Sequence, residues 1–289
     1  MNNPYILPGR VRAALNSLDL RPSRELGQNF LVDPNALQQI VDAAMLTSDD
    51  TVVEVGPGLG VLTYELVQYA GRVISIELDK RLAARLREEF AQTPNLTVIQ
   101  SDVMRVDLVE ALGAGASPAY KVVANLPYQI TSAIIRHFLE AAPAPELLVI
   151  MVQWEVAQRI AARPPEMSVL AHSVQFYAEP EIVARVPASS FVPAPKVDSA
   201  VLRLRRRVQP AVQVDDVDAF FRTIKAGFLQ ARKKLSNALP GGLASMGIKI
   251  EKDQVLRVLE AAGIDPARRA ETLSLEEWSH VHAQLRQSS

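Results

Sequence analysis

Short blocks of consecutive hydrophobic residues alternate with longer amphipathic segments from residue 35 to about residue 160. Each block is rich in Val and Ile and is flanked by Gly, Pro, Asn or Asp. Continuous blocks of this kind are typical of strands that are buried on both faces of a parallel sheet. We therefore predict strands at Thr51–Val55, Val73–Leu78, Leu96–Ile99, Lys121–Ala124 and Leu147–Val152.

The segments between these blocks have helical periodicity, as at Gly60–Tyr69 and Lys80–Phe90. Strands that alternate with helices at this spacing predict βαβ units and a doubly wound α/β sheet. Two later strand patterns, Glu181–Val186 and Ser199–Leu204, flank the proline-rich loop Pro187–Lys196. Because their connection is short, we expect an antiparallel hairpin at one edge of the sheet.

The strand pattern stops after residue 209, and the remaining segments are helical. Gly241–Gly242 and Gly263–Pro266 are expected to end helices, because Gly and Pro disfavour a helix interior. We predict one domain at residues 1–208 and a smaller, all-helical domain at residues 209–289. The expected helices of the second domain are Val217–Leu239, Lys252–Ala262 and Leu275–Arg286.

Composition excludes several classes of protein. The 289 residues are 48% hydrophobic and 22% charged, which is enough apolar surface for a packed core. There is no cysteine, so disulfide scaffolds, cysteine-ligated metals and thiol nucleophiles are excluded. The longest strongly apolar run, Leu147–Val152, is far below the roughly 18 residues of a membrane span. Because the N-terminus has no signal-peptide pattern, we expect a cytoplasmic protein.

A glycine-rich turn follows the first predicted strand, where residues 56–60 read Gly-Pro-Gly-Leu-Gly. Glycines allow a tight turn from strand to helix and a close approach of the backbone to a ligand. The spacing differs from the G-x-G-x-x-G of dinucleotide-binding proteins, and no Gly-Lys-Ser/Thr of a Walker loop follows. A tight turn without a ligand remains the alternative.

Two acidic residues stand at the next strand ends, Glu77 at the end of the second strand and Asp102 after the third. Ligands of open α/β sheets bind outside the carboxyl ends of the strands. A carboxylate at Glu77 is suited to accept hydrogen bonds from both hydroxyls of a ribose, and Asp102 to accept one from an adenine amino group. A cap on the following turn is the alternative role for Asp102.

The segment Glu54–Gly60, Glu77 and Asp102 together resemble the cofactor-binding motifs of S-adenosylmethionine-dependent methyltransferases. This resemblance implies the class I methyltransferase fold, a Rossmann-like α/β sheet of seven strands with a reversed hairpin at one edge. It also implies S-adenosyl-L-methionine as the cofactor.

The fourth predicted strand runs into Asn125, Leu126, Pro127 and Tyr128, which resemble the N/D-P-P-Y/F motif of methyltransferases that act on amino groups of nucleobases. The N6 lone pair of adenine is delocalised into the ring, so the nitrogen must become pyramidal before it attacks a methyl carbon. The carbonyl of the Asn125 side chain and the backbone carbonyl of Leu126 can accept both N6–H bonds and favour that geometry. Pro127 fixes the backbone, and Tyr128 offers a ring for stacking. A simple turn is the alternative.

A base that leaves its stack to reach the pocket exposes a second face, and Phe191 is the candidate to cover it. An anchor for its proline-rich loop is the alternative role of Phe191. No strong general base is required, because the sulfonium is already a cationic leaving group. We therefore expect no catalytic role and no metal site for the scattered histidines, His137, His172, His280 and His282.

Four longer segments resemble one subfamily, the small-subunit ribosomal RNA adenine dimethyltransferases. The resemblance covers roughly residues 20–240. It implies dimethylation at N6 of two adjacent adenosines in the 3′-terminal hairpin loop of 16S rRNA, and a role in small-subunit maturation. The implied partner is 16S rRNA in a precursor of the small ribosomal subunit, and we expect a monomer. The segments are Gly27–Leu31 (GQNFL), Asn125–Thr131 (NLPYQIT), Phe191–Ser199 (FVPAPKVDS) and Gly227–Leu239 (GFLQARKKLSNAL).

The expected site residues form two groups. The catalytic group is Asn125, Leu126, Pro127, Tyr128 and Phe191. The cofactor-binding group is Gln28, Asn29, Leu31, Glu54, Gly56, Gly58, Gly60, Glu77, Leu78, Asp102, Val103 and Asn125.

The charge distribution favours an RNA-binding surface, although the whole chain has 31 basic and 32 acidic residues. Residues 203–234 carry nine basic and three acidic side chains, a net charge of +6. Contacts with phosphates would make binding fall steeply with salt, whereas a solvated cationic surface is the alternative. The expected RNA-binding residues are Arg203, Arg205, Arg206, Arg207, Arg222, Lys225, Arg232, Lys233 and Lys234.

Two segments depart from the subfamily pattern. Trp154 stands where a lysine is usual within Gln153–Ala157, and residues 162–170 lack the usual Tyr-Gly-Arg/Lys stretch. Two other functions stay open: a 23S rRNA adenine N6-methyltransferase of the macrolide-resistance type, and a non-catalytic assembly or RNA-binding factor. The segments Lys196–Ser199 and Arg232–Leu239 argue against the first, and the intact glycine loop and its acids argue against the second.

Overall fold

The computed structural model describes residues 3–19, 29–113 and 119–287. Contacts divide the chain into two compact units, which are described separately below. The first unit joins Met1–Ala157 to Glu179–Arg206, and the second joins Gln158–Ala178 to Arg207–Ser289. The domain boundary expected between residues 208 and 209 stays a prediction, and residues 158–178 group with the C-terminal helices by their contacts.

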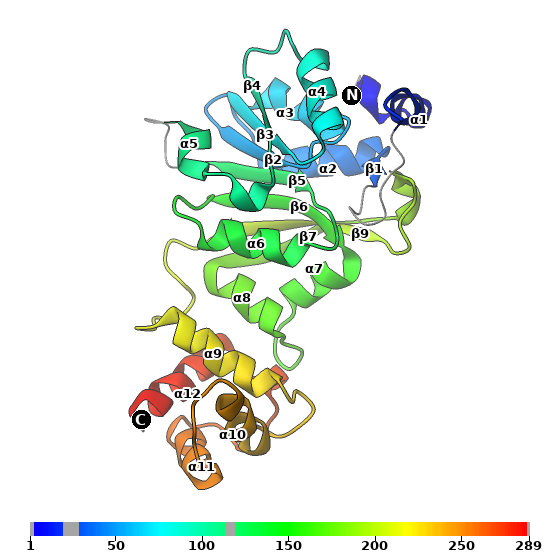
Figure 1. The fold of residues 1–289 in the computed structure, drawn as a ribbon. Helices are drawn as coiled ribbons and strands as arrows, with labels where there is room; N and C mark the ends of the chain where they lie inside the picture. The colour runs from blue at the N-terminus through cyan, green and yellow to red at the C-terminus, as the bar shows by residue number, and fades with distance from the viewer. Residues whose placement is uncertain (1–2, 20–28, 114–118, 288–289) are drawn as a thin grey trace. The chain divides into compact units, whose positions relative to one another are not determined.

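The first unit is built on a sheet of seven strands in the order β4-β3-β2-β5-β6-β9-β7 (Figure 1). The strands from β4 to β6 pair in parallel, whereas β9 pairs antiparallel to β6. The predicted α/β fold with a reversed strand beside one edge is therefore confirmed. The strands are β2 (Thr51–Val55), β3 (Arg72–Glu77), β4 (Leu96–Gln100), β5 (Lys121–Asn125), β6 (Leu147–Gln153), β7 (Ala178–Val186) and β9 (Ser199–Arg206).

Local capping positions several helices of this unit. Asp33 accepts hydrogen bonds from the N–H groups of Asn35 and Ala36 and so caps α2, while Asp79 caps α4 in the same way. These caps satisfy backbone donors that have no partner inside the helix. The helices are η1 (Pro4–Ile6), α1 (Pro8–Ser17), α2 (Pro34–Ala44), α3 (Val61–Tyr69), α4 (Lys80–Glu89), η2 (Val103–Arg105), α5 (Leu108–Leu112), α6 (Thr131–Glu140), η3 (Ala188–Ser190) and the first half of α7 (Trp154–Ala161), which continues into the second unit from Gln158.

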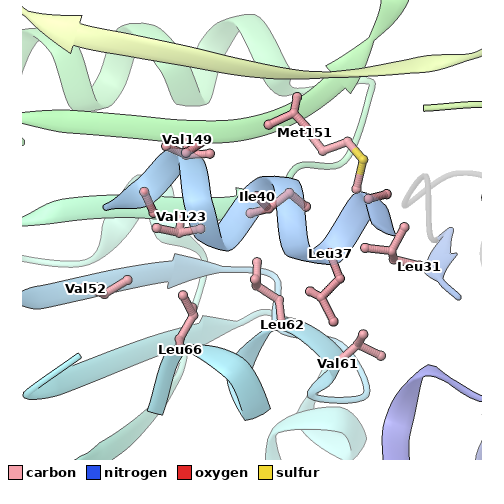
Figure 2. Close-up of a cluster of buried hydrophobic side chains, with 14 of the residues drawn as sticks. Leu31, Leu37, Ile40, Val52, Val61, Leu62, Leu66, Val123, Val149 and Met151 are labelled. Carbon is pink, nitrogen blue, oxygen red and sulfur yellow. The ribbon is translucent and has the colours of Figure 1, made fainter. Parts of the chain in front are cut away.

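The main core lies between α2, α3 and one face of the sheet (Figure 2). Val52, Val123 and Val149 point from three neighbouring strands toward Ile40 of α2, which is fully buried. The residues that alternate with them along the strands are also buried, on the opposite face. Burial on both faces explains why these strands are uninterrupted hydrophobic runs in the sequence.

A second, two-stranded sheet was not predicted. Strand β1 (Phe30–Leu31) pairs antiparallel with β8 (Phe191–Val192), and Phe30 lies opposite Val192. Such short strands carry too little periodicity to be recognised in a sequence. The pairing fixes the segment that precedes α2 against the loop that precedes β9.

The second unit contains the helices that follow the sheet. The single helix predicted at Val217–Leu239 is wrong, because residues 229–234 form a turn between α9 and α10. The N–H groups of Leu235 and Ser236 donate to the carbonyls of Arg268 and Pro266, so a tertiary contact starts α10. The helices are α8 (Val169–Tyr177), α9 (Val217–Phe228), α10 (Leu235–Ser245), α11 (Lys252–Ala261), η4 (Ala270–Thr272) and α12 (Leu275–Gln287).

Gly241–Gly242 was expected to end a helix, but α10 continues through it to Ser245. A side chain at Gly242 would meet the carbonyl oxygen of Ala226 at 2.1 Å, so this glycine permits α10 to approach α9 closely. Within the described residues, no helix combines the length and the apolar character that crossing a membrane requires.

Candidate active site

A cavity of about 190 Å³ opens at the carboxyl ends of the parallel strands, within the first unit. Its walls come from the glycine loop after β2, the ends of β3 and β5, the segments after β4 and β5, and the start of β1. Most residues that the sequence assigned to the site therefore meet in one place. Those that line the cavity are Asn29, Leu31, Glu54, Gly56, Gly58, Glu77, Leu78, Asp102, Val103, Asn125, Leu126, Pro127 and Tyr128.

Two expected site residues, Gly60 and Phe191, do not line the cavity. A side chain at Gly60 would meet Leu86 of α4 and Phe90, the residue after α4, at 2.9 Å, so this glycine serves close packing. Phe191 has 2% of its surface exposed and belongs to the main core, so its ring has no free face for a base in this structure. Gln28 lies outside the described residues.

The glycine loop has the left-handed backbone that glycine favours. Gly56, Gly58 and Gly60 have φ angles of 66°, 59° and 84°. At Gly58 the ring of Phe30 also lies close, since an added Cβ would approach its Cε1 to 3.1 Å. The loop is therefore held between α3 and β1 and turns its backbone toward the cavity.

Glu77 connects the end of β3 to the glycine loop. One carboxylate oxygen, Oε2, accepts a hydrogen bond of 3.0 Å from the N–H of Gly58, and Oε1 accepts one of 2.9 Å from the N–H of Asp79. Only 6% of the residue is exposed, and burial raises the pKa of Glu77 while the backbone donors oppose that rise. Each oxygen keeps a second lone pair, so the carboxylate can still accept from ligand hydroxyls.

Glu54 lies deeper, with 1% of its surface exposed. Its Oε2 accepts hydrogen bonds from the hydroxyls of Ser75, at 2.6 Å, and Thr63, at 2.7 Å. Its Oε1 is buried and has no hydrogen-bond partner among the described residues. Burial raises the pKa of Glu54 to about 7, the neighbouring hydroxyls lower it, and the charge of Glu77 raises it further.

Asp102 caps the turn that follows β4. Its Oδ1 accepts a hydrogen bond of 3.0 Å from the N–H of Met104 at the start of η2. The capping role that the sequence left as an alternative is therefore present, and the same side chain lines the cavity. Leu78, which is 52% exposed, lines the same part of the cavity and offers an apolar surface there.

Asn125 ends β5 with its side-chain amide held in one direction. Its Nδ2 donates a hydrogen bond of 3.1 Å to the backbone carbonyl of Asn29. The side-chain carbonyl Oδ1 accepts no hydrogen bond from a described residue, and neither does the backbone carbonyl of Leu126. Two acceptors thus stand next to each other in the chain at the rim of the cavity.

The next residues of the motif are fixed by their own contacts. The carbonyl of Pro127 accepts from the N–H of Ile130 and from the hydroxyl of Thr131, so it is engaged in the turn before α6. The hydroxyl of Tyr128 lies 2.6 Å from Oγ of Ser199, at the start of β9. Burial raises the pKa of the Tyr128 hydroxyl, which stays protonated and orients the ring.

Several cavity residues were not predicted from the sequence. Phe30 lines the cavity and lies between the expected residues Asn29 and Leu31. The motif Gly27–Leu31 contains it and could have been used to predict it. Ser101 and Asp79 also line the cavity, next to expected residues. Ile130, the residue before α6, is 43% exposed and lines the cavity. No sequence pattern distinguishes it from the apolar residues of α6.

The basic stretch expected to bind RNA is divided between the two units. In the first unit, Arg203 forms an ion pair of 2.6 Å with Glu181, and Arg206 donates to the carbonyl of Leu139. In the second unit, Arg207 donates to the carbonyl of Gln175. Lys225 is half-buried, and the exposed members of the set are Arg205, Arg222, Arg232, Lys233 and Lys234.

Trp154, the departure from the subfamily pattern, packs against a cation. The guanidinium carbon of Arg185 lies 4.9 Å from the centre of the Trp154 ring, and Arg185 forms an ion pair of 2.8 Å with Asp198. The backbone N–H of Trp154 donates to the carbonyl of Asp198, the residue before Ser199.

Among the described residues, no group of three or more His, Asp or Glu is arranged to hold a metal ion.

The cavity suits a ligand that carries positive charge. Its described lining holds four acidic residues and no Lys, Arg or His. S-adenosyl-L-methionine, with its ammonium and its sulfonium, has the charge that such a wall attracts, and Glu77 has acceptors for a ribose. The residues present therefore fit this cofactor.

Sequence comparisons identify close relatives. The family described as ribosomal RNA adenine dimethylase matches residues 20–281. The chain is 46% identical to ribosomal RNA small subunit methyltransferase A of Dehalococcoides mccartyi, over 94% of this chain and 91% of the relative. It is 45% identical to the protein of the same name from Moorella thermoacetica, over 96% and 97% of the two chains.

Solved structures of two methyltransferases resemble this one. The 23S rRNA methyltransferase ErmE is 31% identical, with a TM-score of 0.69 over 90% of this chain and 100% of that one. A dimethyladenosine transferase from Plasmodium falciparum is 25% identical, with a TM-score of 0.75 over 90% of this chain and 98% of that one.

Proposed function

Because this chain belongs to the ribosomal RNA adenine dimethylase family, we propose that it dimethylates N6 of two adjacent adenosines in the 3′-terminal hairpin loop of 16S rRNA. The donor is S-adenosyl-L-methionine, and the substrate is a precursor of the small ribosomal subunit. The observation that carries the proposal is the pair of open carbonyls at Asn125 and Leu126, beside a cavity that suits a cationic cofactor.

Asn125 and Leu126 act on the amino group of the target adenine. When both N6–H bonds point at these two carbonyls, the nitrogen becomes pyramidal and its lone pair is no longer delocalised into the ring. The positive charge that develops on the nitrogen in the transition state strengthens both hydrogen bonds, so they lower the barrier rather than only bind the substrate. Removing one such contact typically costs about 10²–10³-fold in rate.

Tyr128 positions the base. Its hydroxyl is held by Ser199 at 2.6 Å, so the ring has a fixed plane on which the flipped adenine can stack. Such a stacking contact contributes roughly 1–3 kcal/mol. Phe191 would cover the other face only after leaving the core, so we do not assign it that role.

The cofactor is held by residues from three strand ends. Glu77 would accept from the ribose hydroxyls, Asp102 and Leu78 would contact the adenine, and the backbone of the glycine loop would approach the remainder. When bound, the cofactor supplies a methyl group on a cationic leaving group. No side chain is then needed to remove a proton before the transfer.

The second methylation uses the same contacts. After one transfer, and loss of one proton from the cationic nitrogen to solvent, N6 still carries one N–H, which Asn125 or Leu126 can accept. The cavity rim must then accommodate the first methyl group, and we propose that the apolar side chain of Ile130, which is 43% exposed there, provides the surface.

The deciding experiment is mass spectrometry of 16S rRNA from cells with and without this protein. We expect dimethyladenosine at two adjacent positions only when the protein is present. In a parallel test, isolated small and large subunits from a strain lacking both activities are incubated with labelled cofactor. Label in 23S rRNA alone would overturn the assignment in favour of the macrolide-resistance activity.

A binding role without catalysis makes a different prediction. A protein that binds RNA but has no measurable affinity for S-adenosyl-L-methionine in calorimetry would be an assembly factor only. Glu77, the glycine loop and the open carbonyl of Asn125 favour binding of the cofactor and therefore catalysis.

A further inference from the structure

Two of the acids that line the cofactor cavity have ion-pair partners, Asp79 with Arg81 at 3.2 Å and Asp102 with Arg105 at 3.9 Å, whereas Glu54 and Glu77 have none among the described residues. Glu54, Glu77, Asp79 and Asp102 line it, and its described wall has no Lys, Arg or His. The carboxylates of Glu77, Asp79 and Asp102 each accept hydrogen bonds from backbone N–H groups. Glu54 accepts hydrogen bonds from two hydroxyls on Oε2, and its Oε1 has no partner among the described residues.

The surroundings of Glu54 make its charged form costly. Thr63 on α3 and the hydroxyl of Ser75 on β3 face it, and the charged group that acts on it among the described residues is the like-charged Glu77. An ionised carboxylate at 1% exposure without a cation is unfavourable, and a carboxyl in such a place takes up a proton instead. A pKa of about 7 for Glu54 agrees with this reasoning.

The position of Glu54 on the sheet decides which part of a ligand it meets. β2 lies between β3, which carries Glu77 on the ribose side, and β5, which carries Asn125 on the acceptor side. A cofactor that extends from Glu77 to Asn125 must pass the end of β2. The ribose is joined to the sulfonium, which carries the methyl group, and the methionine tail beyond the sulfur carries an ammonium and a carboxylate, so this end of the cofactor is cationic overall.

We propose that Glu54 is a proton switch for the cofactor: it holds a proton in the free protein and releases it to solvent when the cationic end of S-adenosyl-L-methionine enters the cavity. This inference rests on the proposed function, because it takes the cofactor from there. The ionised carboxylate then offsets the charge of the ligand in a place that water does not reach. Glu54 acts here as a positioning residue, not as a base for the target adenine.

Release of a proton from Glu54 makes cofactor affinity depend on pH in one direction. Binding that requires loss of a proton weakens as the pH falls below the pKa of Glu54 in the free protein, by up to about tenfold per pH unit. A neutral ligand gains nothing from the carboxylate and should bind without releasing a proton. 5′-Methylthioadenosine, which lacks both the sulfonium and the ammonium, is such a ligand.

The experiment is titration calorimetry of the full chain with S-adenosyl-L-methionine at pH 7, in buffers that differ in ionisation heat. We expect roughly half a proton to be released per bound cofactor, since a group with a pKa of about 7 is half protonated there. Glu54→Gln should abolish the release and flatten the pH dependence of Kd. Glu88→Gln, a change at an exposed glutamate of α4, should leave the release as in the wild type.

Three outcomes would overturn the inference: proton release that persists in Glu54→Gln, equal release with 5′-methylthioadenosine, or no release in the wild type. If Glu54→Gln does not fold, infrared difference spectra of the wild type replace it. Addition of cofactor should then remove the band of a protonated carboxyl, and an unchanged band would contradict the switch. Absence of any cofactor binding would instead refute the proposed function, so the two failures are distinguishable.

Discussion

The side-chain amide of Asn125 donates a hydrogen bond of 3.1 Å to the backbone carbonyl of Asn29, which lies 96 residues earlier in the chain. The amide nitrogen is thereby occupied, and the carbonyl oxygen on the same side chain is left facing the cavity rim. The segment that begins β1 therefore orients the residue that we expect to contact the target amino group.

Replacing Asn125 by Ala should lower turnover far more than cofactor affinity. The change removes an acceptor that acts in the transition state, so we expect kcat to fall by about 10²–10³-fold. The Kd for S-adenosyl-L-methionine, measured by calorimetry, should change little. Equal losses in Kd and in rate would contradict the role assigned to Asn125.

Replacing Glu77 by Ala should weaken cofactor binding first. The change removes a buried carboxylate that accepts from the N–H of Gly58 and is placed to accept from a ribose. Hydrogen bonds to a charged group contribute about 1.5–3 kcal/mol, so we expect the Kd to rise by at least tenfold. An unchanged dissociation constant would refute the assignment. Glu110→Ala, at an exposed glutamate of α5, is the matched control and should leave the Kd as it is.

Gly56→Ala and Gly58→Ala should differ in their effects. Both residues have left-handed φ angles, which cost a side chain roughly 1–2 kcal/mol of stability. At Gly56 the space for a methyl group is open, whereas at Gly58 it meets the ring of Phe30 at 3.1 Å. We expect urea denaturation to show a larger loss for Gly58→Ala, with a weaker Kd as the loop moves away from Glu77. A loss no greater than that of Gly56→Ala would show that Phe30 yields freely.

Tyr128→Phe and Tyr128→Ala separate two roles of one side chain. Phe keeps the ring but loses the hydrogen bond to Ser199, so we expect kcat/KM on small subunits to fall only a few-fold, consistent with roughly 1 kcal/mol. Ala also loses the stacking surface, worth roughly 1–3 kcal/mol, and should cost a further ten-fold or more. If the two variants were equally impaired, stacking would not be the main role of the ring.

The helical unit should lose stability in mild acid because of His172. This side chain is fully buried against Phe228 and Trp278, and neither ring nitrogen has a partner among the described residues. Burial lowers the pKa of His172 from 6.5 to about 4. The unfolded chain therefore binds a proton that the folded unit does not, and the stability present above pH 6.5 declines as the pH falls toward 4, by up to about 3 kcal/mol.

The measurement for His172 is urea denaturation of the wild type and of His172→Leu between pH 7.5 and about pH 4.5. The free energy of unfolding of the wild type should decline more steeply with acid than that of the variant. Parallel curves would mean that His172 contributes nothing to acid sensitivity.

The parts of the fold that the sequence predicted are those with strong local signals. Strands such as Thr51–Val55 were recognisable because burial on both faces makes them continuous Val-rich runs. Glycines at positions 56 and 58 were recognisable because their backbone angles disfavour other residues. Site residues at strand ends followed from the topology, since parallel strands bring their carboxyl ends to one edge.

The parts that the sequence could not predict depend on contacts between distant segments. The start of α10 is set by hydrogen bonds from the N–H groups of Leu235 and Ser236 to the carbonyls of Arg268 and Pro266. The hydrophobic periodicity of the sequence gives no signal for such contacts. Phe191 was expected at the substrate, yet its pairing opposite Leu31 buries it. The missing partner of one Glu54 oxygen likewise becomes visible only when α3 and β3 are in place.

Strand β9 runs opposite to β6, so it begins at the edge where the parallel strands end. The segment that leads into it, residues 187–198, therefore reaches the cavity rim from the acceptor side, where Ser199 holds Tyr128. Insertions or deletions in this segment would change the shape of the cavity entrance for RNA and leave the glycine loop and Glu77 unaltered. Selectivity for a new nucleic acid could thus evolve on the RNA-facing side of the cavity, while the side that binds the methyl donor stays unchanged.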